Sequence, residues 1–307
     1  NTSTNASTYE WDFGDGKTST EKNPTNTYIY DGTYSVKLIA KGNNTSNTKT
    51  QDIVLSVLTG AEFTELNEVV IRQLYYSNDT TVLWHVAFPD ITKLSDGSLV
   101  CGWREGTKHM QDPRYGRLMK SFGSADGLTW GEPTILYDTE GYDDRDVSLN
   151  RMSDGTIIAN WFKSYTGSTT IMKSNDDCQT WTEPINVKLE NGSSYCSSQA
   201  IEVNGEIWIP TYGSAPGYSK SRVIILKSKD KGNTWTPEVT SAESYKHVDL
   251  QEPNILVAHN GRLIMHIRTA GLNGFMLQCY SDDGGKTWLD WKYLKFIGHA
   301  HELYKTE

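Results

Sequence analysis

A threonine–tryptophan pair recurs at a nearly constant interval from about residue 80 onward. Successive tryptophans of these pairs, Trp130, Trp181, Trp235 and Trp288, are 51, 54 and 53 residues apart. A fixed period of this length is typical of folds in which one supersecondary unit repeats and stacks against its neighbours. We therefore expect these tryptophans to occupy equivalent positions in successive units.

Each repeat also contains an earlier turn of the Asp-Gly or Asn-Gly type between two short apolar segments. These turns lie at residues 96–97, 154–155, 204–205 and 260–261, and such dipeptides are the strongest short-range signal for a β-hairpin. Long amphipathic helical patterns are nearly absent, so the sequence predicts an all-β chain built from four-stranded antiparallel sheets. Residues 66–74 fit a strand or a helix almost equally, and their β-branched residues favour a strand.

The segment that ends in each Thr-Trp pair follows the pattern S-x-D-x-G-x-T-W. Residues 228–235 and 281–288 match it fully, residues 174–181 carry Cys178 in the glycine position, and residues 124–130 are one residue shorter. This repeated pattern resembles the Asp-box of sialidase-type β-propellers over about residues 62–307. The resemblance implies six blades in the family, with the last part missing here, and residues 59–307 as the propeller domain.

The aspartates of these four segments have a structural rather than a catalytic interpretation. Their carboxylates can accept hydrogen bonds from turn N–H groups, and the tryptophans can pack between neighbouring sheets. We expect no catalytic role and no metal at Asp126, Asp176, Asp230 and Asp283.

Residues 1–58 differ from the rest because they are rich in Thr, Asn and Ser. The string Tyr9-Glu10-Trp11-Asp12-Phe13-Gly14-Asp15-Gly16 and the later strand pattern at 32–40 resemble a PKD domain, a small immunoglobulin-like β-sandwich. Few residues precede this string, so we expect the domain to be incomplete at its N-terminal edge. The sequence thus predicts a PKD-like domain at 1–58.

Composition excludes several classes of function. The 29 Lys and Arg against 38 Asp and Glu give a net charge of −9, which argues against a nucleic-acid partner because phosphate binding needs a basic face. No apolar run approaches the roughly 18 residues of a membrane span. The four cysteines show no metal-ligand spacing, so we expect no metal or other cofactor, and they either form up to two disulfides or pack as small apolar groups.

In a propeller the first strand of each blade lines the central funnel, where polar groups converge. The strands before the four turns carry charged and amide clusters at residues 85–90, 143–148, 197–199 and 249–253, and residues 299–302 resemble a fifth. From these clusters we take Arg145, Asp146 and Gln251 as candidate substrate-binding residues. Solvated loop tips are the alternative interpretation.

The resemblance implies a site with a tyrosine nucleophile polarised by a glutamate, an aspartate acid/base and three arginines that bind a carboxylate. Residues 251–255 and 261–268 resemble the blade that supplies the glutamate and one arginine, which implies these roles for Glu252 and Arg268; a buried Glu–Arg pair is the structural alternative. Residues 102–105 similarly imply that Arg104 contacts substrate, and Asp112 matches the acid/base by position only. The tyrosine and the third arginine would follow residue 307. We expect Arg104, Glu252 and Arg268 to converge on one side of the funnel.

One position departs from the family pattern. An arginine normally lies in the string F-R-I-P of the first blade, and here the aligned string is Val86-Ala87-Phe88-Pro89. Because Ala87 cannot pair with a carboxylate, a neutral sugar or a differently held uronic-type acid fits this chain better than sialic acid.

These observations predict a secreted or cell-surface carbohydrate-active protein, a sialidase-superfamily exo-glycosidase acting on a terminal sugar of a glycan or polysaccharide. Two alternatives remain open: a non-catalytic glycan-binding or adhesion module, and a structural subunit of a cell surface. Five aromatic residues could stack on sugars in the enzyme or in the glycan-binding module, although most are expected in the core: Trp103, Trp161, Trp208, Tyr165 and Tyr212. Sequons at Asn1, Asn5, Asn44, Asn78 and Asn191 agree with an extracellular location.

Overall fold

The computed structural model describes residues 1–26, 28, 32–55, 85–106, 108–109, 115–240, 245–270, 274–298 and 303. The chain divides into two compact units, residues 1–71 and 72–307, which are described separately below. The described residues form strands and turns and contain no α-helix, so the predicted all-β class is confirmed. The expected domain boundary at 58/59, the expected strand at 66–74 and the sequon at Asn78 lie outside the described residues.

The first unit contains one antiparallel sheet with the strand order β2-β1-β3-β4. Its strands are β1 (Thr8–Asp12), β2 (Thr18–Ser19), β3 (Gly32–Gly42) and β4 (Thr45–Leu55). Tyr9 and Phe13 are buried, and the Trp11 ring stacks on Phe13 with centroids 6.2 Å apart. Gly14 turns the chain with φ +76°, and a Cβ there would lie 2.9 Å from the Ser35 backbone nitrogen. The turn after Phe13 therefore requires glycine.

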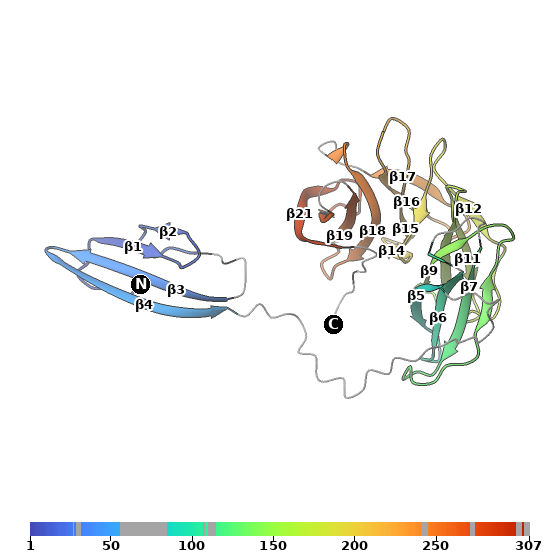
Figure 1. Cartoon of the computed structure of the whole chain (residues 1–307), viewed down its shortest axis with the longest axis horizontal. Helices are drawn as coiled ribbons and strands as arrows, with labels where there is room; N and C mark the ends of the chain where they lie inside the picture. Colours follow the sequence, from blue (N-terminus) through green and yellow to red (C-terminus); the bar gives the residue numbers. More distant parts are fainter. Residues whose placement is uncertain are drawn as a thin grey trace. The chain divides into compact units, whose positions relative to one another are not determined.

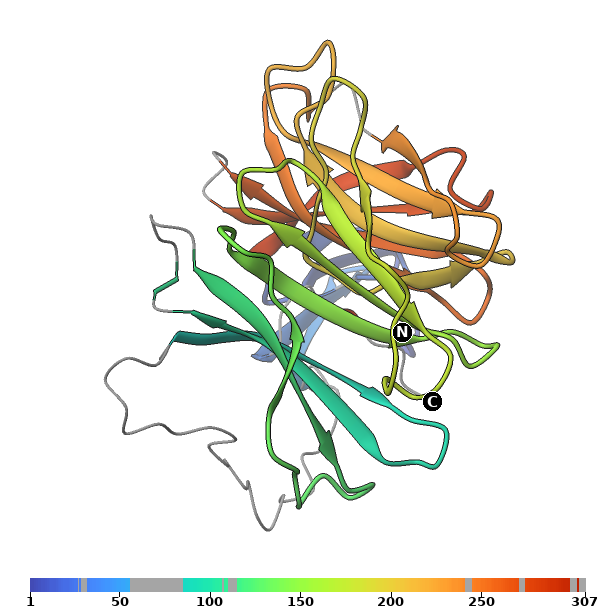
Figure 2. The same ribbon diagram turned by 90° about the vertical axis from the view of Figure 1, so that its right-hand side faces the viewer.

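The second unit contains four antiparallel sheets, each made of consecutive strands, that follow one another along the chain as the repeat predicts (Figure 1). Figure 2 shows the same sheets from the side, stacked in chain order. We call them blades 1 to 4. Blade 1 contains β5 (His85–Lys93), β6 (Leu99–Gly106), β7 (Gly116–Gly123) and β8 (Thr134–Tyr137). Blade 2 contains β9 (Asp144–Arg151), β10 (Ile157–Lys163), β11 (Thr169–Ser174) and β12 (Ile185–Val187). Blade 3 contains β13 (Tyr195–Cys196), β14 (Ile201–Val203), β15 (Glu206–Gly213), β16 (Arg222–Ser228) and β17 (Thr236–Thr240), and blade 4 contains β18 (Asp249–Val257), β19 (Leu263–Ala270), β20 (Phe275–Ser281) and β21 (Leu289–Ile297).

The hydrophobic core lies between the faces of neighbouring blades. One cluster joins Val100 and Leu118 of blade 1 to Trp161 of blade 2, and two further clusters join blade 2 to blade 3 and blade 3 to blade 4. The tryptophans of the four Asp-boxes each pack against a different cluster: Trp130, Trp181, Trp235 and Trp288. Burial between sheets is therefore what makes the blades stack.

Every Asp-box connects the third strand of its blade to the fourth. In the last box, the Asp283 carboxylate accepts hydrogen bonds from the Thr287 N–H at 2.9 Å and the Thr287 hydroxyl at 2.6 Å. Equivalent bonds lower the pKa of Asp176 and Asp230 to about 2, mainly through the threonine hydroxyl of each box. These carboxylates are occupied by their own turns, which agrees with a structural role.

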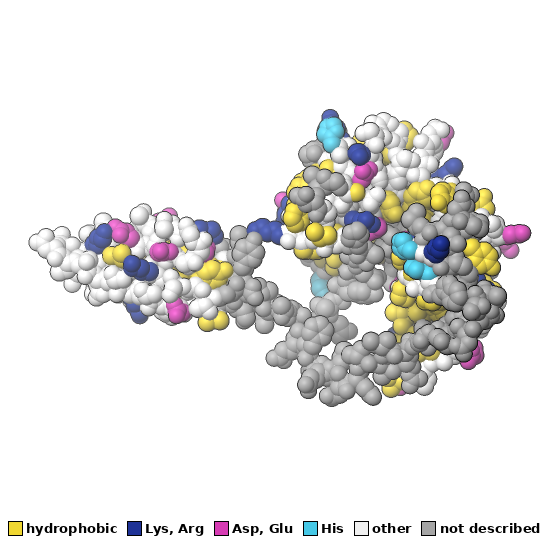
Figure 3. All heavy atoms as spheres, in the orientation of Figure 1, with side chains coloured by type: hydrophobic (Ala, Val, Ile, Leu, Met, Phe, Trp, Pro, Cys, Tyr) yellow, Lys and Arg dark blue, Asp and Glu magenta, His cyan; other side chains and the backbone are white. Residues whose placement is uncertain are grey.

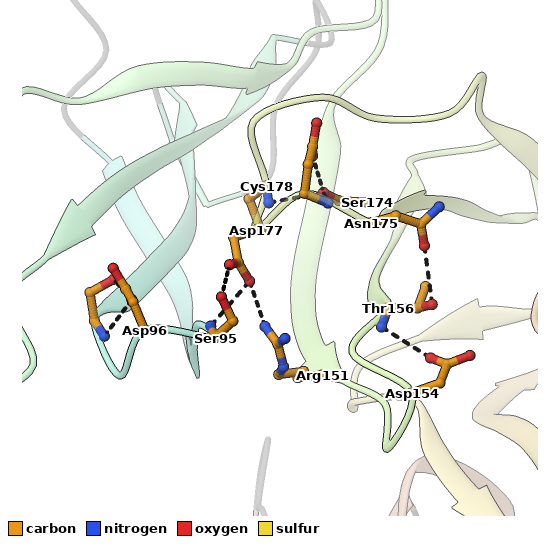
Figure 4. A network of polar contacts seen from close by, with 11 residues as sticks. Ser95, Asp96, Arg151, Asp154, Thr156, Ser174, Asn175, Asp177 and Cys178 are labelled. Carbon is orange, nitrogen blue, oxygen red and sulfur yellow. Dashed lines mark hydrogen bonds and ion pairs between the residues drawn. The ribbon is translucent and has the colours of Figure 1, made fainter.

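Polar contacts tie the hairpin turn of one blade to the next blade (Figure 4). The Asp177 carboxylate, in the Asp-box of blade 2, accepts hydrogen bonds from the Ser95 N–H at 3.2 Å and from the Ser95 hydroxyl in the turn of blade 1. Arg151 of blade 2 pairs with the same carboxylate. In the next interface, Asp154 forms an ion pair of 3.0 Å with Lys231 of the blade 3 box. The contacts run in one direction along the chain, from each turn to the following box.

The glycine position of the Asp-box packs directly on the preceding blade. A Cβ on Gly285 would lie 2.3 Å from the Trp208 ring, and a Cβ on Gly232 would lie 3.3 Å from Ile158. In the second box Cys178 occupies this position, fully buried in the cluster that contains Leu94 and Val100 of blade 1. The box sequence is therefore fixed by contact between blades as well as by its own turn.

All four cysteines are buried and free: Cys101, Cys178, Cys196 and Cys279. Burial raises the pKa of Cys101 to about 11 and that of Cys178 to about 12. The thiols are thus kept protonated and pack as small apolar groups, which was one of the two possibilities that the spacing left open.

Candidate functional site

The first strands of blades 1, 2 and 4 share an irregularity at the same register. The pairing of the first strand with the second shifts by one residue between Ala87 and Asp90 in blade 1, and between Gln251 and Asn254 in blade 4. In blade 2 the shift lies in the part of β9 that pairs with Asn160 and Phe162 of the second strand. At each bulge one residue has a left-handed backbone: Phe88 with φ 54°, Asp146 with φ 52° and Glu252 with φ 46°. This conformation costs a residue with a side chain about 1–3 kcal/mol and is often found at functional sites.

The bulges of blades 1, 2 and 4, together with residues 197–199 of blade 3, surround one cavity of about 290 Å³. Its lining comes from the first strand of each blade and from the short link between β13 and β14: Phe88, Pro89, Asp90, Asp146, Val147, Ser148, Ser197, Ser198, Gln199, Glu252 and Asn254. A concave site with a few convergent polar groups is the usual form of a small-ligand pocket. We call it the central cavity.

Glu252 and Arg268 form an ion pair beside the central cavity. The Arg268 guanidinium donates from Nη1 to Oε1 of Glu252, and the two side chains are 27% and 15% exposed. Gln251 lies opposite Arg268 in the β18–β19 ladder.

Asp146 has a contrasting environment in the same cavity. Its Oδ1 atom is buried and has no hydrogen-bond partner among the described residues, and the nearest cation, Arg145, approaches only to 3.9 Å. Burial raises the pKa of Asp146 to about 7; Arg145 lowers it in part, and the negative charge of Glu252 raises it further. The cavity therefore holds a carboxyl group with a raised pKa, Asp146, together with Glu252, which is ion-paired with Arg268.

Arg145 is held by two aromatic rings rather than by a close ion pair. Its guanidinium lies 5.4 Å from the centroid of Phe88 and 5.9 Å from that of Phe162. The side chain is only 9% exposed, and its Nε–H has no hydrogen-bond partner within the described part of the chain. Contacts of a guanidinium with ring faces fix its position while leaving donors available.

Arg104 lies in the interior of blade 1 and is absent from the cavity lining. It is fully buried, its Nε donates to Oδ1 of Asp143 at 2.7 Å, and its Nη2 donates to the Lys108 carbonyl at 3.0 Å. Its charge still reaches Asp146, whose pKa it lowers. The structure thus brings Glu252 and Arg268 together, whereas Arg104 is engaged by Asp143. Ala87 is its ladder partner.

Polar side chains also connect blades across the central cavity. Gln199 of blade 3 donates from Nε2 to Oδ1 of Asp90 in blade 1 at 2.8 Å, and the Leu149 N–H donates to Oδ2 of Asp90 at 2.7 Å. The Ser198 hydroxyl donates to the Pro253 carbonyl at 2.9 Å. These bonds fix the first strands of all four blades relative to one another, which preorganises the cavity.

Sequence reasoning named Tyr212 only as an aromatic that could stack on a sugar, although a simple signal links it to the site. The residue seven positions after each turn glycine is Arg104, Phe162, Tyr212 and Arg268 in blades 1 to 4. Burial, together with the nearby charges of Glu252 and Asp146, raises the pKa of the Tyr212 hydroxyl.

The remaining candidates, Asp112 and residues 299–302, lie outside the described residues. Within the described ranges no group of three His, Cys, Asp or Glu residues could hold a metal ion, and no helix is long and apolar enough to cross a membrane.

Two families match the chain. Residues 97–297, well over half of the sequence, match the BNR repeat-like domain, and residues 1–57 match the PKD domain. Collagenase ColQ1 of Bacillus cereus (strain Q1) is 48% identical over 46 residues, which is 15% of this chain and 5% of the collagenase. The chain therefore spans a very small part of that curated relative.

Solved structures share the fold of the chain at low sequence identity. A protein of unknown function from Dyadobacter fermentans DSM 18053 aligns with a TM-score of 0.61 and 24% identity over 72% of this chain and 73% of that one. The NanB sialidase of Streptococcus pneumoniae gives 0.59 and 11% over 88% and 66% of the two chains. The α-L-arabinanase of Penicillium chrysogenum, complexed with arabinobiose, gives 0.54 and 15% over 68% and 66%.

Proposed function

This chain belongs to the family of BNR repeat-like domains, and from this premise we propose that its second unit is a glycosidase that removes a terminal neutral sugar from a glycan. The observation that carries the proposal is the carboxyl pair of the central cavity. Asp146 is protonated up to about pH 7, and Glu252 is paired with Arg268. Glycoside hydrolysis needs such a pair, with one carboxylic acid and one carboxylate.

In the proposed reaction the Asp146 carboxyl group gives its proton to the glycosidic oxygen while the bond from that oxygen to the anomeric carbon breaks. The Glu252 carboxylate stabilises the positive charge that develops at the sugar ring. Water then adds its oxygen to the anomeric carbon. One of its protons stays on the new hydroxyl group, and the other passes to the Asp146 carboxylate, which restores the acid. The products are the free sugar and the shortened glycan, and no further reactant is consumed.

The lining of the central cavity supports a neutral sugar. It holds the carboxyl groups of Asp90, Asp146 and Glu252 together with amides and hydroxyls, and the described lining includes no Lys or Arg. An anionic sugar would lack the bidentate arginine contact that Ala87 cannot supply. The arabinanase of the same fold is complexed with a neutral disaccharide, so the fold accommodates such ligands.

The test is an assay of the protein on a panel of neutral α- and β-glycosides, uronic glycosides and α-sialosides. We expect turnover of a neutral glycoside, lowered by about two to four powers of ten in Asp146→Asn and also reduced in Glu252→Gln. Asp290→Asn, on the exposed outer strand β21, serves as the matched control and should keep full activity. Sialoside turnover that Glu252→Gln abolishes would overturn the neutral-sugar assignment. Binding without turnover of any glycoside would overturn the enzyme and support the glycan-binding module.

We further propose that the protein is secreted or displayed at the cell surface, with the N-terminal PKD domain as a spacer. The Thr-, Asn- and Ser-rich composition of residues 1–58 supports this location. Lys and Arg are interspersed with Asp and Glu on the face shown in Figure 3. Recovery of the protein in the medium or on intact cells, measured by fractionation, is expected; retention in the cytosol would contradict it.

A further inference from the structure

Exposed aromatic side chains gather at one end of the four blades. Each second strand runs from a hairpin turn back to the opposite end of its blade, so the loops between second and third strands all lie at that opposite end. Among the described residues, Tyr165 and Tyr218 lie in two of these loops and are exposed by 62% and 36%. Tyr115, directly before β7, and Phe275, the first residue of β20, are exposed by 54% and 36%. Tyr142, in the link from blade 1 to blade 2, is also exposed.

The other end of the blades differs. The hairpin turns and Asp-boxes contribute Leu128 to the exposed large hydrophobic residues of the described chain, and no aromatic side chain. The two remaining exposed aromatics of the described residues, Tyr293 and Phe296, lie on the outer strand β21. Exposed hydrophobic side chains scattered singly over a surface need no explanation, whereas exposed aromatic side chains gathered at one end of the blades do. Their distribution therefore indicates a function at that end.

Two carboxyl groups of the central cavity lie toward this same end of their strands. Asp146 is the third residue of β9 and Glu252 the fourth of β18, so both lie near the strand ends that meet these loops. Arg268 lies two residues before the end of β19, which corresponds to roughly 7 Å along a strand. These carboxyl groups and Arg268 are therefore the part of the site that lies nearest the loops.

The loops that carry these aromatics are joined by backbone hydrogen bonds. Ser164 donates to the Asp143 carbonyl at 2.9 Å, Ser194 donates to the Gly167 carbonyl at 2.9 Å, and Ser193 donates to the Ser214 carbonyl at 3.0 Å. We call residues 138–143, 164–168, 188–194 and 214–221 the rim. Because these bonds link blades 1, 2 and 3, the rim holds its aromatics in fixed positions before any ligand binds.

Two of the rim tyrosines show local features that favour a binding role. Tyr165 has φ 67°, a left-handed conformation that is costly for a residue with a bulky side chain and is retained mostly at functional positions. Tyr218 packs against the buried guanidinium of Arg222, 5.3 Å from its ring centroid. Arg222 in turn donates to the carbonyls of Lys220 and Tyr245 at 3.1 Å, so one face of Tyr218 is fixed.

From these observations we propose that the rim tyrosines, Tyr142, Tyr165 and Tyr218, bind the sugar units that follow the terminal unit held in the central cavity. The inference rests on the proposed function and deepens it, because it makes the substrate a neutral chain of several sugars. The cavity volume of about 290 Å³ is at the small end for a ligand pocket and leaves the following units outside. A sugar ring presents apolar C–H faces that stack on flat aromatic rings, and a tyrosine adds a hydroxyl for a sugar hydroxyl.

The experiment measures binding to a glycan array graded in length, followed by calorimetry with the neutral sugar that binds and with its chains of increasing length. We expect the wild-type affinity to rise with chain length. Tyr165→Ala and Tyr218→Ala should each weaken the binding of long chains by about two- to tenfold, as for the loss of one ring contact, and leave the binding of the single sugar unchanged. In Tyr165→Phe the affinity should still rise with glycan chain length almost as much as in the wild type.

Leu128→Ala is the matched control, because it removes a side chain of similar exposure (47%) at the opposite end of blade 1, and it should bind every length as the wild type does. Equal affinity for all lengths, or no effect of both tyrosine variants on long chains, would overturn the rim inference. The proposed function is then still upheld if a neutral glycoside is turned over in the assay described above. If no glycan binds at all, both proposals are overturned. The melting temperature of each variant shows whether a loss of binding reflects loss of folding.

Discussion

The burial that raises the pKa of Asp146, and so suits it to the proposed role of acid, also lowers the stability of the folded protein at neutral pH. The Asp146 pKa of about 7, raised mainly by burial from an ordinary value of 3.8, means that folding disfavours the charged form. The folded chain therefore holds this proton more tightly than the unfolded chain, and stability falls as pH rises from about 4 to about 7. Above that range the penalty is fully present.

Asp146→Asn should remove this penalty, because the amide is neutral at every pH. We expect the variant to be more stable than the wild type at pH 8, by up to about 4 kcal/mol, and nearly equal to it at pH 4. Urea unfolding at the two pH values measures the difference. The opposite result would be a variant that is less stable than the wild type at pH 8 and equal to it at pH 4. It would show that Asp146 is ionised and well paired in the folded protein.

Single residues of the site were predictable to different degrees. The sequence placed Glu252 and Arg268 in one blade, and the ladder explains why they meet, since Gln251 lies opposite Arg268 and the bulge follows. The protonation of Asp146 was not predictable, because it depends on burial by four blades that no local pattern records. Arg104 was expected at substrate, and its charge is instead engaged by Asp143, 39 residues later in the chain.

At the scale of elements, the turns determine the blades and the Asp-box glycines determine how closely the blades pack. Gly285 and Gly205 have nearly the same backbone, with φ 83° and 82°. A Cβ on Gly285 would lie 2.3 Å from Trp208, whereas a Cβ on Gly205 meets nothing within 4 Å. The two positions therefore separate the cost of the left-handed conformation from the cost of contact between blades.

We expect Gly205→Ala to cost about 1 kcal/mol of stability, which is the penalty of a left-handed alanine. Gly285→Ala should cost at least about 2 kcal/mol more, because overpacking a buried contact adds to that penalty. Chemical denaturation of both variants measures the comparison. Equal losses would indicate that the Trp208 ring moves away freely and that the box does not limit blade packing.

The sequence predicted the strands well because Asp-Gly and Asn-Gly turns mark hairpin ends. The bulges were not predictable, since one extra residue breaks the alternation of apolar and polar side chains without any distinctive residue type. Blade 3 shows this most clearly. Its first strand is split into β13 and β14 around residues 197–200, and the serines and the amide of that link line the central cavity.

At the scale of the second unit, the blades are coupled through contacts from each turn to the next Asp-box. Asp177 accepts bonds from Ser95 of blade 1 and from Arg151 of its own blade. The contact between Ser95 and Asp177 joins residues 82 apart in sequence, which is why spacing alone predicted the repeat but could not predict which side chains link its units. The stacking order follows from the repeat, and the linking chemistry follows from the fold.

Asp177→Ala should lower the stability of the protein by about 1–2 kcal/mol, because it removes a charge-assisted hydrogen bond and an ion pair between partly exposed groups. Asp290→Ala is the control, since Asp290 has a left-handed backbone like Asp177 (φ 51° and 54°) and is paired, among the described residues, only with Lys292 within one exposed strand. It should lower stability by about 1 kcal/mol less than Asp177→Ala does. Thermal unfolding checks both. The Asp177 interpretation fails if the two substitutions have the same small effect.

The position seven residues after each turn glycine has a consequence for how such proteins diverge. Blades 1 to 4 place Arg104, Phe162, Tyr212 and Arg268 on one equivalent backbone site. Because the turn and the Asp-box fix the register of each blade, a substitution here alters the chemistry around the centre without shifting any strand. Gene duplication of a single blade thus supplies several independent positions at which selection can change ligand preference while foldability is retained.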